Sequence, residues 1–357
     1  MKYAVMTTKH HDGFCLFDSK YTDYKCTNTK SGRDFIQEYV DAFRAEGIKI
    51  GFYYSLLDWH HPDYPHYGDT HHPMRENEAY RNKKHDFSNY INYMHHQVEE
   101  LLTNYGKVDI MWFDFSYGDM SGEKWCATKL VEMIRRLQPG IVIDNRLIGD
   151  SNYTNSFTDH TMPLYAGDFE SPEQIIPSCG LKDIQGRDVP WEACMTLNDH
   201  WGYCVGDHNY KTPQNVIHML TECVSKGGNL ILNVGPNAKG EIPRKSVEIL
   251  EIVGEWMHEN GKSIYCCGKS DLAKPEWGRY TQNGRFLYAH VFERGVAAFR
   301  LEGLEGKVKK ARLLADGSEL PLLRPWNAEK YPNDAFVDLC TAELPDPLDT
   351  VIELELL

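Results

Sequence analysis

Carboxylates that could carry out acid–base chemistry stand at two places in the chain. Asp114 closes the apolar run VDIMWFDF, where a lone carboxylate can serve as nucleophile, base or metal ligand. The segment GDFESPEQIIP holds Asp168, Glu170 and Glu173, and Glu192 follows in WEACM. Two carboxylates that face each other across a cleft are the minimum for glycoside hydrolysis. The alternatives are a helix-capping role for Asp114 and an ordinary acidic surface loop for the others.

Histidines form a second group near the start of the chain. They are His10, His11, His60, His61, His66, His71 and His72. Such density suggests a metal site, but adjacent histidines on loops rarely both reach one ion, and helical His-x-x-x-His spacing is missing. Because 8 tryptophans and 21 tyrosines are also present, we expect neutral histidines that hydrogen-bond sugar hydroxyls, with no metal and no cofactor.

Alternating strands and helices must bring these residues together. Strands are predicted over residues 3–8, 48–55, 108–113, 141–145, 193–197 and 230–234, with a weaker one near 157–159. Helices are predicted over residues 34–46, 86–105, 123–137, 213–226 and 243–260. This alternation is typical of parallel βα units, and continuously apolar strands indicate a sheet that is covered on both faces.

Polar residues follow the clear strands at their carboxyl ends, where a (β/α)8 barrel builds its active site. A doubly wound open sheet also has its site there, but draws on fewer strand ends. We therefore predict an α/β fold, a (β/α)8-like TIM barrel that is one strand short, over residues 1–262. Short apolar runs separated by Gly, Asn-Gly and Asp-Gly turns then predict a small antiparallel β-sandwich domain over residues 263–357.

The composition argues against two classes of partner. The formal net charge is −14 and the sequence has no basic stripe, so we expect no nucleic-acid binding. No apolar run reaches the roughly 18 residues of a membrane helix, so we expect no membrane partner. The ten cysteines are scattered without metal-ligand spacing, which favours a reducing, cytoplasmic compartment.

Seven segments, in this order, resemble the α-L-fucosidases of glycoside hydrolase family 29. They are YAVMTTKHHDGFCLFDSKYTDY, GFYYSLLDWHHPDYP, GKVDIMWFDF, IDNR, GDFESPEQIIP, WEACMTLNDHWGY and GGNLILNVGPNAKGEIP. The resemblance covers roughly residues 1–265 and is highly specific. It implies a retaining exo-α-L-fucosidase on a (β/α)8-like barrel, which needs no metal and releases terminal fucose from a fucosylated oligosaccharide or glycoconjugate.

The resemblance also implies roles for individual residues. Asp114 matches the nucleophile, which would form a covalent fucosyl-enzyme. The family's Thr-Pro-Glu pattern falls on Ser171-Pro172-Glu173, so Glu173 is the expected acid/base, with Asp168 and Glu192 as fallbacks. Residues that match or adjoin the fucose pocket are His10, His11, Tyr54, Trp59, Trp112, Arg146 and Trp201. An arginine beside the nucleophile would keep its carboxylate ionised.

The chain departs from the family at its start. Family members open with a strand that reads like Phe-Gly-x-Phe-x-His-Trp-Gly, whereas this chain begins at what resembles their second strand. We therefore expect the first βα unit to be missing, either by truncation or because another chain fills the gap. A homo-oligomer and a periplasmic or secreted location both stay open on this ground.

Two further hypotheses follow from these observations. The chain could be a catalytically impaired relic of the family that binds fucose without turnover, because its pocket is incomplete. It could also be a metal-dependent hydrolase on a similar barrel, in view of its histidines. A chelator would abolish activity in the second case only.

Overall fold

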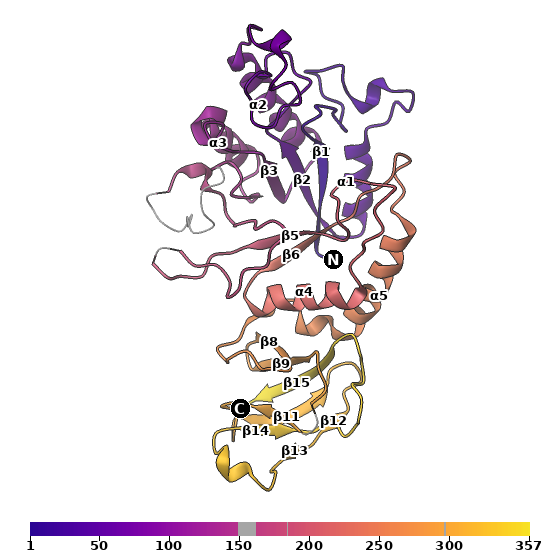
Figure 1. Ribbon diagram of the computed structural model, residues 1–357, viewed down its shortest axis with the longest axis vertical. Coiled ribbons are helices and arrows are strands. Elements are labelled where there is room, and N and C mark those ends of the chain that lie inside the picture. Colours follow the sequence, from indigo (N-terminus) through magenta and orange to yellow (C-terminus); the bar gives the residue numbers. More distant parts are fainter. Residues whose placement is uncertain (149–161, 184, 296–297) are drawn as a thin grey trace. The chain divides into compact units, whose positions relative to one another are not determined.

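The computed structural model describes residues 1–148, 162–183, 185–295 and 298–357 (Figure 1). The weak strand expected near residues 157–159 lies outside the described residues. The described chain forms two compact units: residues 1–171 with 182–189, and residues 172–181 with 190–357. The domain boundary expected between residues 262 and 263 lies in a 3-10 turn, Gly261–Ser263, within the second unit.

Strands and helices alternate in the first unit, as the sequence predicts. They are β1 (Tyr3–Lys9), α1 (Phe35–Ala45), β2 (Lys49–Ser55), α2 (Phe87–Asn104), β3 (Ile110–Asp114), α3 (Ala127–Leu137) and β4 (Val142–Ile143). The four strands form one parallel sheet in the order β1-β2-β3-β4, and the three helices lie alongside it (Figure 1). Because the strands are parallel, their carboxyl ends meet at the same edge of the sheet.

Local sequence signals explain the limits of two helices. The side chains of Asp34 and Asp86 accept backbone hydrogen bonds at the starts of α1 and α2. Gly47 and Gly106 follow the two helices with φ of +69° and +72°, a left-handed conformation that glycine adopts without strain.

Two predicted elements are shorter in the structure. The helix expected over residues 123–137 is interrupted at Cys126, whose φ is +50°, so a 3-10 turn (Gly122–Trp125) precedes α3. The strand expected over residues 141–145 is reduced to β4, and Asp144 continues it only as an isolated bridge to Phe169.

Successive side chains of β2 and β3 point alternately into the core of the first unit and toward the opposite face of the sheet. Phe52, Tyr54 and Phe113 are fully buried in a core that also takes residues from α1, α2 and α3. Successive side chains of a strand point to opposite faces of the sheet. Tyr53 and Trp112, which are register partners across β2 and β3, therefore lie on the other face.

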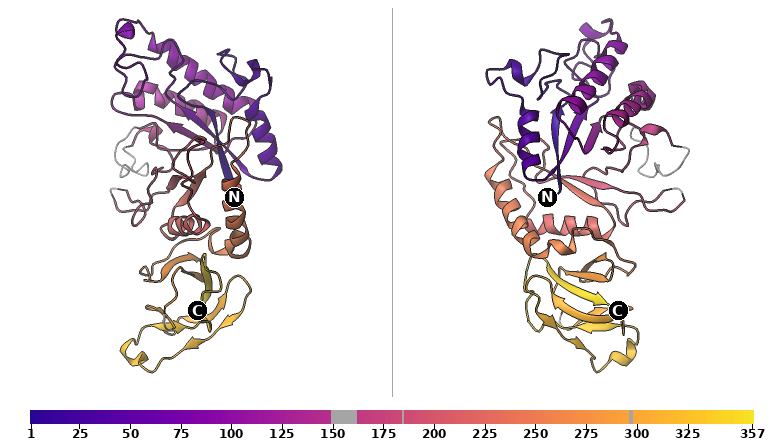
Figure 2. Two further views of the ribbon diagram at one scale, coloured as in Figure 1. Left: turned by 45° about the vertical axis from the view of Figure 1, so that its right-hand side comes forward. Right: turned by 180° about the vertical axis from the view of Figure 1, so that it is seen from behind.

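The second unit begins with a second run of alternating elements. They are β5 (Glu192–Thr196), α4 (Pro213–Ser225), β6 (Asn229–Asn233) and α5 (Arg244–Asn260), and β5 pairs with β6 in parallel. Helix α4 packs against α5 and β6 and also against β8 of the antiparallel part (Figure 2).

The remainder of the second unit is antiparallel, as predicted. Its strands are β7 (Gly268–Lys269), β8 (Gly278–Asn283), β9 (Phe286–Val291), β10 (Phe299–Leu301), β11 (Val308–Leu313), β12 (Glu319–Leu320), β13 (Leu322–Leu323), β14 (Ala335–Val337) and β15 (Thr350–Leu356). They form a six-stranded sheet, β12-β11-β15-β9-β8-β7, and a three-stranded sheet, β10-β14-β13. Leu287 and Ala289 of β9 share a core with Phe299 and Val337 of the smaller sheet, whereas Tyr288 packs in a separate core with residues of α4 and α5.

Candidate active site

Asp114 ends β3 at the edge of the parallel sheet where the strand carboxyl ends meet. It pairs in register with Ser55, the last residue of β2. The next residue, Phe115, has a φ of +74°, a conformation that non-glycine residues seldom adopt and that often marks functional sites. The Phe115 ring lies 5.5 and 5.7 Å from the rings of His10 and His11. The turn after β3 thus brings Asp114 next to the histidine pair.

Donors from Tyr53, Arg146 and Phe115 converge on the Asp114 carboxylate. The Tyr53 hydroxyl donates to Oδ2 at 2.7 Å, Arg146 Nη1 lies 3.3 Å from Oδ1, and the backbone N–H of Phe115 also donates to Oδ1, at 2.9 Å. The Asp114 side chain is 17% exposed. Hydrogen bonds to a carboxylate and a nearby guanidinium stabilise its negative charge. Asp114 is therefore an oriented, partly accessible anion.

His10 extends this hydrogen-bond network. Its Nδ1 accepts the backbone N–H of His11 at 2.9 Å, so Nε2 carries the proton in the neutral ring. His10 Nε2 lies 3.2 Å from the Tyr53 oxygen, and we infer that it donates there. Protons then point from His10 to Tyr53 and from Tyr53 to Asp114, and this direction fixes the orientation of all three side chains.

Burial keeps both histidines neutral. Desolvation, with Lys9 as a second cause, lowers the pKa of His10 from 6.5 to about 4. Desolvation, with a smaller contribution from His10, lowers the pKa of His11 to about 4 as well. The His11 ring stacks on Trp59 with centroids 3.7 Å apart. Among the described residues its buried Nδ1 has no hydrogen-bond partner, so this atom is available to a ligand hydroxyl.

Aromatic rings and a guanidinium form one wall of the site. Trp112 stacks on Tyr53 with centroids 5.6 Å apart, and the Arg146 guanidinium lies over the Trp112 ring at 4.9 Å. Within the described part of the chain, the indole N–H groups of Trp59 and Trp112 are buried without a partner. Stacked rings with free donors suit a ligand that has both an apolar face and hydroxyl groups.

Tyr54 does not lie in this site, and the prediction for this residue is corrected. Its side chain is fully buried, and its hydroxyl donates to Gln97 Oε1 of α2 at 2.7 Å. The neighbouring Tyr53 contacts Asp114 instead. Adjacent strand residues face opposite sides, so an assignment that is off by one residue moves a side chain from the site to the core.

The carboxylates expected to provide the acid/base occupy different surroundings. Asp168 accepts from Ile143 N–H and pairs with Arg135 at 2.5 Å, which gives it a structural role in the first unit. Glu173 and Glu192 belong to the second unit. Glu173 is exposed beside β5, and Glu192 is buried at the start of β5.

The structure therefore brings only some of the predicted residues together. Those in contact around Asp114 are His10, His11, Trp59, Trp112 and Arg146. Trp201 belongs to the second unit and is 39% exposed. Tyr53 also belongs to the site, although it was not predicted. The alternation of side-chain direction along β2 is the signal that could have identified it.

Histidines of the segment between β2 and α2 pack mainly on one another and on tyrosines. His66 Nδ1 lies 3.3 Å from His85 Nε2, and the rings of His66 and His72 are 4.5 Å apart. Across the described residues, no group of three or more His, Cys, Asp or Glu side chains is arranged to hold a metal ion.

Glu170 is a further buried carboxyl of the first unit. Its side chain is 2% exposed and accepts a hydrogen bond from Asn145 Nδ2. Burial raises the pKa of Glu170 from 4.5 to about 7. A carboxyl group that holds its proton near neutral pH has the electrostatics of a general acid, but this one has little access to a ligand.

The raised pKa of Glu170 predicts a specific pH dependence of stability. Between pH 4.5 and 7 the folded state keeps a proton on Glu170 that the unfolded state has released. The free energy of unfolding should therefore fall by about 3 kcal/mol as pH rises through this window. The low pKa values of His10 and His11 act in the opposite direction between pH 4 and 6.5. The difference in the free energy of unfolding between the Glu170→Gln variant and the original chain at each pH cancels the contribution of the histidines.

Urea titrations of both proteins between pH 4.5 and 8 measure this effect. The stability of Glu170→Gln relative to the original chain should rise with pH and level off above pH 7. If the difference in stability between the two proteins is constant across this pH range, the folded and unfolded states bind the Glu170 proton equally, and the prediction is wrong.

Comparison with known proteins addresses the family. A model of the family described as "Alpha-L-fucosidase" matches residues 1–262. The chain belongs to the α-L-fucosidase family. The human plasma α-L-fucosidase is 30% identical over 271 residues, which are 74% of this chain and 52% of that protein. The chain thus spans about half the length of the curated relatives it matches.

Two solved α-L-fucosidase structures match the whole chain. Isoenzyme 1 from Paenibacillus thiaminolyticus is 61% identical with a TM-score of 0.96, and the match covers 100% of this chain and 83% of that one. An α-L-fucosidase from Bacteroides thetaiotaomicron is 31% identical with a TM-score of 0.83, and the match covers 100% of this chain and 79% of that one. It was solved as a trapped covalent intermediate with 2-fluoro-fucosyl fluoride, in a Glu-to-Gln mutant.

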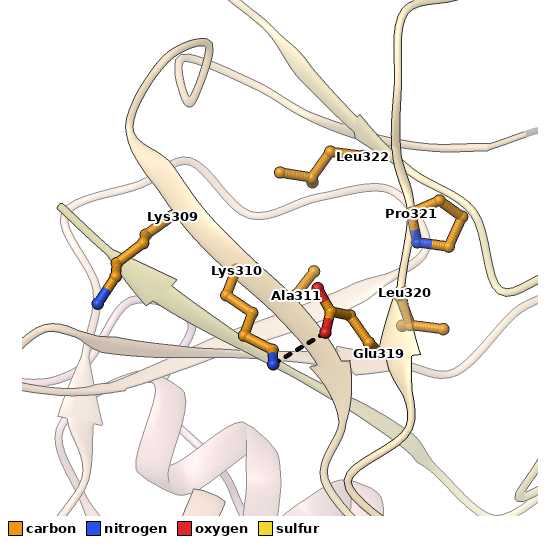
Figure 3. Close-up of a pocket in the computed structure, with 7 residues that line it drawn as sticks. All are labelled: Lys309, Lys310, Ala311, Glu319, Leu320, Pro321 and Leu322. Atoms are coloured by element: carbon orange, nitrogen blue, oxygen red, sulfur yellow. Dashed lines mark ion pairs between the residues drawn. The ribbon is translucent and has the colours of Figure 1, made fainter.

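This α-L-fucosidase family member also has a hollow on its antiparallel part (Figure 3). It is lined by Lys309, Lys310, Ala311, Glu319, Leu320, Pro321 and Leu322, and Lys310 pairs with Glu319 across it at 2.9 Å. Such an exposed ion pair contributes little to stability or to binding. Separately, none of the described helices is both long and apolar enough to span a membrane.

Proposed function

We propose that this chain is a retaining exo-α-L-fucosidase that hydrolyses terminal α-L-fucose from fucosylated glycans. The observation that carries the proposal is the Asp114 carboxylate, which Tyr53 and Arg146 orient beside two neutral histidines. A retaining glycosidase uses a carboxylate as its nucleophile, and neutral imidazoles can hydrogen-bond the hydroxyl groups of a sugar. Membership of the family supports the choice of fucose as the sugar.

In the first step, a carboxylate oxygen of Asp114 attacks the anomeric carbon of fucose. The bond to the leaving oxygen breaks, and the acid/base gives its proton to that oxygen. In the second step the same residue takes a proton from water, whose oxygen attacks the anomeric carbon and releases Asp114. The net configuration is retained because two inversions occur. The trapped covalent intermediate of the Bacteroides relative supports this sequence.

Glu173 is the proposed acid/base. It is exposed, and it follows Pro172 in the segment that matches the family pattern. Asp168 is engaged by Arg135, and Glu192 is buried, so both are weaker candidates. The mechanism requires the carboxyl groups of Glu173 and Asp114 to stand roughly 5 to 5.5 Å apart. We propose a (β/α)8-like barrel over residues 1–262, followed by a β-sandwich, as the fold that sets this separation.

Neutral imidazoles suit the sugar because each can both donate and accept a hydrogen bond. We assign the ring hydroxyls of fucose to His10 and His11, and an apolar wall for its methyl group to Trp112. Trp59 and Trp201 then shape the rim of the pocket. A sugar is uncharged, so protonated histidines would pay a desolvation cost without gaining an ionic partner.

Hydrolysis of 4-nitrophenyl α-L-fucoside tests the proposal. Release of nitrophenolate gives the rate, and proton NMR of the first-formed fucose gives its configuration. We expect the α-anomer first, no effect of EDTA, and no turnover of the matched β-L-fucoside. The β-anomer first would indicate an inverting enzyme, and loss of activity with EDTA would indicate a metal-dependent hydrolase. Fucose binding without turnover would support the impaired relic.

A pair of adjacent tyrosines gives a sharper test of the site. Tyr53→Phe removes the hydroxyl that donates to Asp114, and should lower kcat about 10- to 100-fold with little change in stability. Tyr54→Phe removes a hydroxyl buried against Gln97, and should lower the free energy of unfolding by about 1 to 2 kcal/mol while kcat changes less than about twofold. Steady-state kinetics and urea unfolding measure both effects. Equal kcat values for the two variants would contradict the assignment of Tyr53.

A further inference from the structure

A continuous chain of hydrogen bonds links Asp114 to the buried carboxyl group of Glu170. Arg146, which pairs with Asp114, donates from Nε to Ser171 Oγ at 2.8 Å and from Nη2 to the Ser171 carbonyl at 2.9 Å. The guanidinium is thus gripped on one side by Ser171 and presents its remaining nitrogen, Nη1, to Asp114. A planar guanidinium held by two bonds has a defined direction for the third, so the position of Ser171 sets the position of Arg146.

Asn145 holds Ser171 in turn. Its Oδ1 accepts the backbone N–H of Ser171 at 3.1 Å and the Ser171 hydroxyl at 3.0 Å. Because the Ser171 hydroxyl donates its hydrogen bond to Asn145, its oxygen can accept a hydrogen bond from Arg146. The chain of bonds therefore works only if the Asn145 amide has its oxygen toward Ser171.

Glu170 decides that orientation. Glu170 Oε2 accepts from Asn145 Nδ2, and among the described residues this is the hydrogen bond that the amide nitrogen makes. Glu170, Ser171 and Asn145 are at most 9% exposed, which leaves water little access as a replacement. Without an acceptor at position 170, Asn145 would bury an unsatisfied N–H group, an unfavourable state that a flip or a shift would relieve. Either change breaks the bonds to Ser171.

We propose that Glu170 is a positioning residue, which holds the Asp114 nucleophile in its attacking geometry through Asn145, Ser171 and Arg146. The inference rests on the proposed function for its kinetic consequences. Glu170 acts as a hydrogen-bond acceptor and touches no reacting atom. Either a carboxylate oxygen or the carbonyl oxygen of a protonated carboxyl group can fill this role.

Two substitutions with side chains of similar size distinguish the role of Glu170 as a hydrogen-bond acceptor from its role in packing. Glu170→Gln keeps an acceptor oxygen for Asn145, whereas Glu170→Met fills the same space without one. With 4-nitrophenyl α-L-fucoside we expect Glu170→Met to lower kcat about 10- to 100-fold, because a displacement of about 1 Å can cost this much. KM should stay within about twofold, since His11 and Trp59 hold each other by stacking outside this chain of bonds. Glu170→Gln should stay within about threefold of the original kcat.

Glu100→Met is the matched control for removal of a buried glutamate. Glu100 is 7% exposed and accepts from Ser19 and Lys20, outside the candidate site. The Glu100→Met variant should have a lower free energy of unfolding, and its kcat should stay within about twofold of that of the original chain. The proposal is overturned if Glu170→Met keeps full kcat, if Glu170→Gln is as impaired as Glu170→Met, or if Glu100→Met loses kcat to the same degree.

A crystal structure of Glu170→Met separates this inference from the proposed function. Loss or lengthening of the contact between Arg146 Nη1 and Asp114 Oδ1 is expected whether or not the chain turns over fucosides. An unchanged contact overturns the positioning role. Absence of turnover in the unsubstituted chain would instead count against the proposed function alone.

Discussion

Replacement of Asp114 with alanine is expected to lower kcat for 4-nitrophenyl α-L-fucoside by about four to six orders of magnitude. Without the carboxylate no fucosyl-enzyme can form, and removal of a covalent nucleophile has effects of this size in other hydrolases. KM should change far less, because His11 and Trp59 hold each other by stacking and not through Asp114. Stopped and steady-state assays of nitrophenolate release measure the loss.

Three companion measurements make this result specific. Asp119→Ala, an exposed aspartate five residues further along, should keep kcat within about twofold. Asp114→Asn keeps an acceptor for Tyr53 but lacks the charge, and should be nearly as inactive as Asp114→Ala. Azide should restore turnover of Asp114→Ala by attacking the anomeric carbon from the vacated side, and the product should be a β-fucosyl azide. Full activity of Asp114→Ala would refute its role as nucleophile.

The second large effect is expected in stability, at Lys9. The Lys9 ammonium is fully buried, lies 3.0 Å from Asp58 Oδ2, and sits over the rings of Tyr54, Tyr90 and Tyr93 at 4.5 to 5.7 Å. Lys9→Met removes one charge and leaves the other buried without its counterion. Such a change costs about 3 to 5 kcal/mol, which should appear as a lower urea midpoint of the first unit.

Asp58 links this pair to the candidate site. Its Oδ1 accepts the backbone N–H groups of His60 and His61, and so holds the turn that carries Trp59. Lys9→Met combined with Asp58→Asn removes both charges and keeps the acceptor, so it should recover at least half of the lost stability. Arg244→Met breaks an exposed pair with Glu248 and should cost less than about 1 kcal/mol. If Lys9→Met costs no more than this control, the buried pair does not stabilise the fold.

Much of the fold could be predicted from local patterns. Helices α1, α2, α4 and α5 begin and end within about two residues of their predicted limits, because capping aspartates, a proline and terminal glycines act on the chain nearby. The predicted helix around Cys126 was wrong over its first turn, where a 3-10 turn and the left-handed backbone of Cys126 precede α3. The parallel strands were found because they are continuously apolar and follow helices.

The candidate site was predictable to the extent that its residues end strands. His10, His11 and Asp114 each follow an apolar run, and parallel pairing brings such ends to one edge whatever the details of packing. Tyr53 and Tyr54 show where this reasoning stops. The two residues are chemically identical neighbours, and only the register of β2 against β3 and the packing of α2 decide which one faces Asp114.

Glu170, Asn145 and Lys9 carry no signal that distinguishes them in the sequence. The sequence around a buried glutamate does not differ from that around an exposed one, and an asparagine such as Asn145 is equally typical of a surface turn. Their roles depend on burial and on partners 25 to 49 residues away in the chain.

The sequence alone therefore determined the alternation of elements, the edge at which polar groups gather and the resemblance to a family, because these follow from the order of residue types along the chain. Tertiary structure alone decided which tyrosine reaches the carboxylate, which glutamate is buried and which lysine has a counterion. These outcomes depend on side-chain direction and desolvation, which arise only when distant segments pack together.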